Sequence, residues 1–212
     1  MEHYFRFSGR IIRDKTWASL SFSAQAVFPV IASHCNIIGK AFPAEKRIGN
    51  LAGLTEKIVR RGINDLEASN ILKVSGYITR RGHKGKKFHV SLPPPQHITN
   101  FSGSDTKAPF PFHSSIIDSC WGCWKNLTPS AKALYPVMRY FAFTENDNKE
   151  EYLKRDFDCC EAEPDVLAEY AGITTKSVKS AISSLAANDL LEEIEESHGT
   201  SWYVYLRRDM PF

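Results

Sequence analysis

An internal repeat constrains the fold of this chain more than any other feature of the sequence. The segment Leu20–Val30 aligns almost in register with Leu127–Val137, at an offset of 107 positions. A second block, Ala52–Val59, aligns with Ala171–Val178 at an offset of 119 positions. Two copies of one unit are therefore expected, and any fold proposed for the first copy has to suit the second.

The two offsets place about a dozen extra residues in the second copy, in the polar stretch Thr144–Glu163. Between the copies, three consecutive prolines begin a polar segment that we predict to be an extended linker over residues 93–109. The predicted domains are residues 1–92 and residues 110–212.

Each copy carries the pattern of three helices. In the first copy, Ser21 or Ser23 can cap a helix whose apolar residues recur at helical spacing. A short second helix is predicted to follow Pro43 and to end at Gly53, and Thr55 can cap a third helix. A short helix, a glycine turn and a Thr-capped helix together indicate a helix-turn-helix.

A β-hairpin is predicted to follow the third helix. The stretch Val74–Arg80 is rich in β-branched and aromatic residues, and Phe88, Val90 and Leu92 alternate with polar neighbours. The glycine-containing segment Arg81–Lys87 is predicted to be the loop between the two strands. We therefore expect a mainly α fold with small β-hairpins (α+β), organised as tandem winged-helix domains joined by a Pro-rich linker.

The pattern Leu51-Ala52-Gly53-Leu54-Thr55, continued by Val59, Arg61, Ile63 and Leu66, resembles the winged helix-turn-helix family of plasmid replication initiators and related mobile-element regulators. The segment Ile116–Ser119, followed by Trp124 and Leu127–Ala131, resembles the lead-in of the same family. The resemblance implies a non-enzymatic, sequence-specific binder of double-stranded DNA. Such a protein would act as a replication initiator or as a transcriptional regulator of a plasmid or other mobile element.

The two copies match this family unequally. The family usually carries Ser or Thr three residues after the helix-capping residue, which Ser177 keeps and Ile58 does not. Ser180 stands in the second copy where the first has Arg61, which argues against base reading by the second copy.

Charge divides the chain into a basic and an acidic part. Up to Pro95 there are 16 Lys and Arg against 6 Asp and Glu, a net charge of +10. The remainder has 11 basic and 18 acidic residues, a net charge of −7. The basic part is therefore the candidate for contact with a polyanion.

The predicted DNA contacts of the first domain combine the outward side of the third helix with the hairpin. Side chains of these types read base edges in a major groove or bind phosphate. The predicted residues are Lys46, Arg47, Thr55, Glu56, Lys57, Ile58, Arg60, Arg61, Asn64, Arg80, Arg81, His83, Lys84, Lys86 and Lys87.

The second domain is expected to serve a different partner. Thr175, Lys176 and Lys179 form a candidate second DNA contact. The run Glu192–Glu196 contains four carboxylates that a phosphate backbone would repel. We therefore expect this domain to mediate homodimerisation or to bind another protein partner.

Catalysis, cofactors and metals are not expected. Cys120, Cys123, Cys159 and Cys160 could in principle ligate zinc, but the first copy has no cysteine at the corresponding positions. Nucleophile elbows and phosphate-binding loops are absent from the sequence. The five cysteines and the lack of a signal peptide or membrane span favour a cytoplasmic location.

Two alternatives stay open at this point. The chain could be a winged-helix protein-interaction adaptor without essential DNA binding, which the acidic second copy favours. It could also bind RNA, although the basic loop contains no aromatic side chains to stack on unpaired bases.

Overall fold

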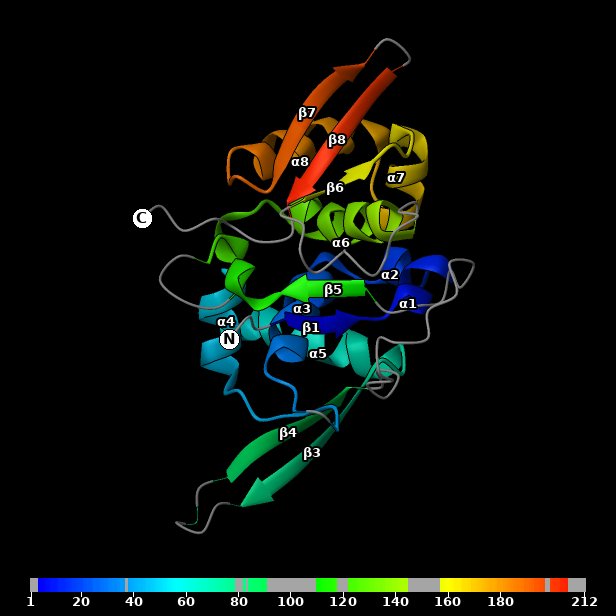
Figure 1. The fold of residues 1–212 in the computed structure, drawn as a ribbon. Helices are drawn as coiled ribbons and strands as arrows, with labels where there is room; N and C mark the ends of the chain where they lie inside the picture. Colours follow the sequence, from blue (N-terminus) through cyan, green and yellow to red (C-terminus); the bar gives the residue numbers. More distant parts are fainter. Residues whose placement is uncertain are drawn as a thin grey trace.

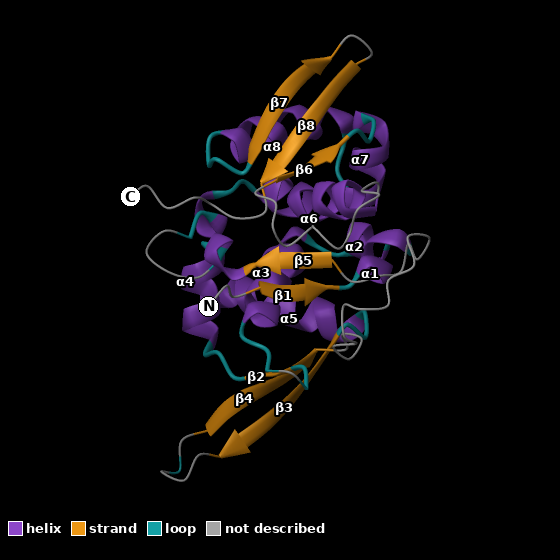
Figure 2. Ribbon diagram, viewed as in Figure 1, coloured by secondary structure: helices purple, strands orange, loops and turns teal. Residues whose placement is uncertain are grey.

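The computed structural model describes residues 4–36, 38–78, 82, 84–90, 110–117, 122–144, 157–196 and 199–205. Helices combine with three small antiparallel sheets, which confirms the predicted α+β class (Figure 2). The predicted linker, residues 93–109, lies outside the described residues, as do residues 145–156 of the extra segment.

The same order of elements occurs twice (Figure 1). The first half contains β1 (Tyr4–Phe7), α1 (Gly9–Arg13), α2 (Thr16–Ser19), α3 (Phe22–Ser33), β2 (Lys40–Ala41), α4 (Glu45–Ala52), α5 (Glu56–Ala68), β3 (Leu72–Ile78) and β4 (Lys84–Val90). The second half contains β5 (Phe110–His113), η2 (Ser114–Ile116), η3 (Trp124–Asn126), α6 (Pro129–Thr144), β6 (Phe157–Cys160), α7 (Pro164–Ala171), α8 (Thr175–Ala186), β7 (Leu191–Glu196) and β8 (Gly199–Tyr205).

The sheets and turns of the two halves also correspond. One sheet has the strand order β2-β4-β3 and the other has the order β6-β8-β7. Gly53 and Gly172 end α4 and α7 with φ of +68° and +69°, and both lie in the left-handed region that favours glycine. Asn70 and Asp189 precede β3 and β7 with φ of +57° and +56°. The repeat in the sequence is thus a repeat of backbone geometry.

Some predicted boundaries differ from the structure. The short helix begins at Glu45 rather than directly after Pro43, which places an acidic residue in its first turn, where the helix dipole favours it. The predicted loop Arg81–Lys87 is too long, because β4 begins at Lys84 and stays in register with β3 as far as Ile78.

Helix capping follows the prediction at one site and departs from it at another. Ser21 caps α3 and accepts a hydrogen bond from the Ala24 amide at 3.3 Å. Thr55 occupies the N-cap position of α5, but its side chain makes no capping bond. In the second copy, Thr174 does cap α8, and Ser177 Oγ lies 2.9 Å from the Thr174 hydroxyl. Ile58, at the position equivalent to Ser177, offers no such hydrogen bond.

Two buried tryptophans, one from each half, each form a hydrogen bond with the other half. Trp17 Nε1 donates to the carbonyl of Ala133 at 2.8 Å, and Trp124 Nε1 donates to the carbonyl of Ala26 at 2.9 Å. Each acceptor lies three residues before the proline inside the long helix of the opposite half. The carbonyl four residues before a proline lacks its helical N–H partner, and the proline ring crowds this turn, so each acceptor is next to a carbonyl at which the helix is locally opened. The tryptophans aligned by the repeat therefore make the same contact in both directions.

A two-stranded sheet joins the halves at their centre, where β1 pairs with β5 (Figure 1). Phe5 lies directly opposite Phe112, its counterpart in the repeat, and their rings stack with centroids 5.0 Å apart. The buried apolar residues of both halves form one continuous hydrophobic cluster. The copies therefore share one core, and the hairpins β3–β4 and β7–β8 extend from opposite ends of the molecule.

Each long helix also caps a shorter helix of the opposite half. Gln25 Nε2 donates to the carbonyl of Ala171 at 3.0 Å, and Lys132 Nζ donates to the carbonyl of Ala52 at 2.8 Å. Ala52 and Ala171 end α4 and α7, where helix carbonyls lack partners within the helix. An ammonium group also suits the negative end of the helix dipole.

Replacement of Gly53 by alanine is expected to destabilise the protein by about 2 kcal/mol or more. Gly53 has a positive φ, and a Cβ there would overlap the backbone carbonyl of Lys125 in the other half. Gly76→Ala is the control, because no atom lies within 4 Å of a Cβ at that position. Urea unfolding measures both variants, and equal stabilities would contradict the close packing at Gly53.

Lys132→Gln tests the buried ammonium group. Burial lowers the pKa of Lys132 from 10.5 to about 8, so the unfolded chain holds this proton more tightly than the folded one between pH 8 and 10.5. The free energy of unfolding should therefore rise with pH across this window by about 1–3 kcal/mol relative to Lys132→Gln. Glutamine is the matched substitution because Gln25 makes the equivalent contact. Parallel pH profiles of unfolding for the two proteins would contradict the assignment.

Candidate nucleic-acid interface

Helix α5 is held rigidly by its inner face. The three apolar residues predicted to point inward are buried, and they are Val59, Ile63 and Leu66. Gly62 allows a close approach to α3, because a Cβ there would lie 2.6 Å from the carbonyl of Ser23. Asp65 accepts a hydrogen bond from the Ser21 amide at 2.8 Å, at the start of α3. Packing against the core and α3 therefore holds α5 in place and leaves its outer face toward solvent.

The outer face of α5 carries every residue predicted to face away from the core. These residues are exposed and comprise Glu56, Lys57, Ile58, Arg60, Arg61 and Asn64. Thr55 is exposed just before the helix, and Lys46 and Arg47 are exposed on α4. Arg47 Nε donates to His34 Nε2 at 3.0 Å, which ties this guanidinium to the end of α3.

Glu45 links α5 to the first hairpin. Its carboxylate accepts Arg60 Nε at 2.6 Å and pairs with Lys86 Nζ at 2.7 Å, and its side chain is only 14% exposed. Arg60 is also 3.5 Å from Glu56. Burial alone would raise the pKa of the Glu45 carboxyl, but its hydrogen bonds with Lys86 and Arg60 hold that pKa below its usual value. Glu45 was not among the predicted site residues. Its position directly before Lys46, a predicted DNA contact, was the one feature of the sequence that pointed to it.

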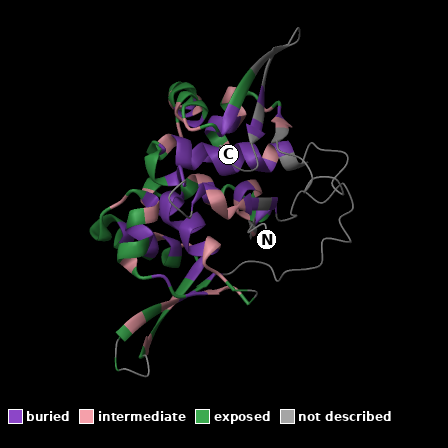
Figure 3. Ribbon diagram, turned by 60° about the vertical axis from the view of Figure 1, so that its left-hand side comes forward, coloured by how far each residue is buried: buried purple, intermediate pink, exposed green. Residues whose placement is uncertain are grey.

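The first hairpin divides its basic residues between two faces. Phe88 and Val90 are buried, so alternation along β4 places Lys84 and Lys86 on the same face as these core residues. Lys87 lies on the opposite face, so the three lysines predicted as DNA contacts of the hairpin do not share one face. Arg80, Arg81 and His83 lie outside the described residues. Figure 3 shows the hairpin extending from the buried core, with exposed and half-buried residues along it.

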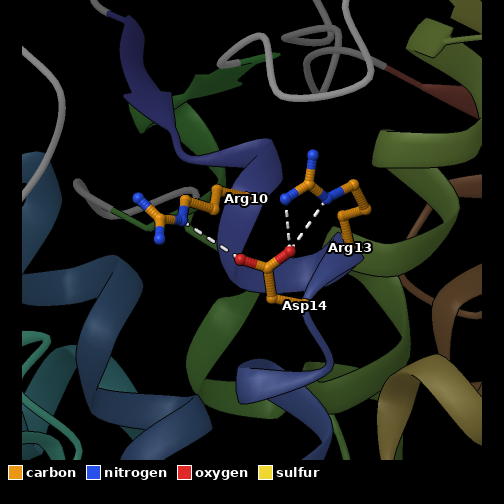
Figure 4. Close-up of polar contacts among 3 residues, drawn as sticks. All are labelled: Arg10, Arg13 and Asp14. Carbon is orange, nitrogen blue, oxygen red and sulfur yellow. Dashed lines mark hydrogen bonds and ion pairs between the residues drawn. The ribbon is translucent and has the colours of Figure 1, made fainter.

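Much of the positive charge of the first half lies away from α5. Arg10 and Arg13 both bind Asp14 in the segment around α1, with nitrogen–oxygen distances of 3.1 Å for Arg10 and 2.5 and 2.8 Å for Arg13 (Figure 4). These hydrogen bonds, from Arg13 and then Arg10, lower the pKa of Asp14. Lys15 pairs with Glu169 of α7. The pairs of Arg10 and Arg13 are local to α1, whereas that of Lys15 joins the two halves, and none of these cations lies on α5.

The corresponding surface of the second half is less basic. Thr175 Oγ1 donates to Asp165 at 2.8 Å, so this hydroxyl has a partner within the protein. Lys176 and Lys179 are exposed on α8. Exposed carboxylates of β7 include Glu192 and Glu193, which keeps the second hairpin acidic.

The described residues contain no group of three or more histidine, cysteine or acidic side chains placed to hold a metal ion. Cys123 and Cys160 are buried, and Cys120 lies outside the described part of the chain. Among the described helices, none is both long and apolar enough to cross a membrane.

Comparison with protein-family models gives no match, and neither the curated proteins nor the solved structures contain one. A functional proposal for this chain therefore depends on its own geometry and charge.

Glu45→Gln is expected to weaken the acid dependence of stability. The Glu45 carboxyl has a lowered pKa in the folded protein, so its contribution is present above the ordinary value of 4.5 and is lost as the pH falls below it. Unfolding by urea, measured from neutral pH downward, should show a smaller loss of stability in the variant. Glu56→Gln is the control, since that more exposed carboxylate is 3.5 Å from Arg60. An unchanged acid profile in Glu45→Gln would contradict the bridge.

Proposed function

We propose that the protein is a non-enzymatic binder of double-stranded DNA made of two winged-helix units in one chain. The observation that carries the proposal is the outer face of α5, where exposed Lys57, Arg60, Arg61 and Asn64 lie on a helix fixed from behind. A helix of this kind following a tight turn fits a major groove, where arginine recognises guanine and asparagine recognises adenine. Ile58, 36% exposed, suits contact with a thymine methyl group.

The first hairpin supports this proposal as the wing. Lys84 and Lys86 lie on the face that is continuous with the core side of the sheet, and Lys86 meets Arg60 through Glu45. This bridge orients both cations. Because one carboxylate pairs with two positive groups, the three side chains together keep a positive net charge. Phosphate contact by these side chains would add affinity that depends on salt and not on sequence.

The second unit is proposed to serve mainly as a protein contact. Its exposed carboxylates on β7 would meet a phosphate backbone unfavourably. Helices α3 and α6 and strands β1 and β5 already pack against each other between the two halves. A homodimer would therefore need another surface, and the second hairpin offers one. A replication initiator or a transcriptional regulator of a plasmid or other mobile element fits this design.

The first experiment is binding of the full chain to a labelled random-sequence duplex across a salt series. The variant Lys57→Gln/Arg61→Gln should reduce the slope of log affinity against log salt by about two units, because each lost phosphate contact changes the slope by about 0.9. The matched control is Lys176→Gln/Lys179→Gln on α8, which should change the slope by less than one unit.

Two outcomes would count against the proposal. No binding of the native chain at low salt would rule out a duplex-binding protein. Equal losses in the two double variants would show that the halves contribute alike, contrary to the proposed division. If the expected result is obtained, footprinting of selected sites distinguishes the biological roles: short direct repeats in an origin indicate an initiator, and an operator beside a promoter indicates a regulator.

A protein-interaction adaptor is the second candidate, and the acidic second hairpin is the observation that favours it. Under this alternative the exposed cations of α5 are incidental. Their replacement in Lys57→Gln/Arg61→Gln would then leave the biological activity intact, whereas reversal of Glu192 and Glu193 would abolish it.

A further inference from the structure

The back of the β2-β4-β3 sheet carries a row of basic side chains. This face lies opposite the one that packs on the core, since Phe88 and Val90 are buried and His89 between them is exposed. The strand register places Lys40 directly opposite His89, and Lys73 directly opposite His89 on the other side. Two lysines therefore flank His89 on neighbouring strands, and an anion bound on this face would meet positive charge from both sides.

Lys87 extends this row by one step along β4. It pairs with Ser75 and, by alternation, shares the face of His89. Within the described part of the chain, Lys40, Lys73 and Lys87 make no ion pair with a carboxylate. The charge on this face is therefore available to a ligand, whereas Lys86, on the other face, pairs with Glu45.

Two aromatic side chains lie on the same face, beside the cations. Phe42, which follows β2, is 50% exposed, and its ring meets the ring of Tyr77 edge to face with centroids 5.5 Å apart. Tyr77 lies across β4 onto Gly85, because a Cβ at Gly85 would come within 2.6 Å of the tyrosine ring. The glycine thus leaves room for the ring to lie against the strand.

We propose that this face, made of Phe42, Tyr77, Lys40, Lys73, Lys87 and His89 and here called the back face, binds single-stranded nucleic acid. Aromatic rings on a sheet supply stacking platforms for unpaired bases, and the neighbouring lysines follow the phosphate backbone. Duplex DNA hides its base faces within the stack, so the aromatic pair favours a single strand. Stacking is tolerant of sequence, and the site should accept a strand without strong base preference.

The back face is separate from the duplex surface proposed for α5. Lys84 and Lys86 lie on the opposite side of the hairpin from Tyr77 and Lys87, so the two surfaces can be altered independently. This inference does not depend on duplex binding. It revises the sequence-based argument against RNA, which considered only the hairpin loop, whereas the aromatic residues lie outside that loop.

The test uses the full chain and a labelled oligothymidylate of about 20 nucleotides, which does not pair with itself. Tyr77→Ala and Gly85→Ala should each weaken its binding about tenfold, the first by removing the ring and the second by displacing it. Gly76→Ala is the matched control on the same hairpin and should bind like the native chain, because its Cβ would meet nothing within 4 Å. Lys73→Gln/Lys87→Gln should lower the salt slope by about 1.4 units, at about 0.7 for each contact.

Duplex binding, measured on the same variants, separates this proposal from the previous one. Lys57→Gln/Arg61→Gln should weaken duplex binding and retain oligothymidylate binding, and Tyr77→Ala should do the reverse. An oligouridylate of equal length shows whether the strand is DNA or RNA, and either preference supports the proposal. Urea unfolding confirms that Tyr77→Ala and Gly85→Ala remain folded, and Phe42→Ala replaces either one that does not.

Three results would overturn the proposal. The first is absence of oligothymidylate binding at low salt. The second is equal binding by the native chain, Tyr77→Ala and Gly85→Ala. In the third, the Lys73→Gln/Lys87→Gln variant loses self-association in sedimentation while it keeps oligothymidylate binding. That last result would show that the back face binds the acidic hairpin of a second copy of this chain rather than a nucleic acid.

Discussion

The reciprocal hydrogen bonds from Trp17 to Ala133 and from Trp124 to Ala26 join the two halves at the centre of the molecule. Each tryptophan fills the shared core of the two halves, and its only polar atom reaches a carbonyl beside the proline of the opposite long helix. A buried indole N–H without an acceptor would cost free energy, so the acceptor fixes where the two helices meet. The pairing of β1 with β5 and the stacking of Phe5 on Phe112 then close the interface between the halves.

The candidate interface depends on this centre. The turn at Gly53 sets the direction of α5, and this turn is packed against the backbone of Lys125 and capped by Lys132, both from the other half. The equivalent turn at Gly172 lies against Ala18 and is capped by Gln25. Each exposed helix is therefore positioned by residues of the opposite copy.

Electrostatics refine the simple division into a basic and an acidic half. Arg10, Arg13 and Lys15 contribute to the charge of the first half, but they bind Asp14 and Glu169 where the halves meet. Glu45 holds Arg60 and Lys86 in one arrangement between α5 and the hairpin. In the described part of the first hairpin, Lys84 and Lys86 lie on one face and Lys73 and Lys87 on the opposite face. This division separates the two proposed nucleic-acid surfaces.

The sequence by itself determined the elements of this protein. Apolar residues at helical spacing, Ser21 as a cap, glycine at the ends of α4 and α7, and alternation along β4 are local patterns, and local sterics and burial act on them directly. The exposed residues of α5 followed from the same periodicity. Tertiary structure alone decided how the copies meet, because the partners of Trp17, Lys132 and Gly53 are more than 70 residues away in the chain. It also decided which cations stay available, since an ion pair such as Glu45 with Lys86 depends on the folding of the hairpin back toward α4 and not on proximity in sequence.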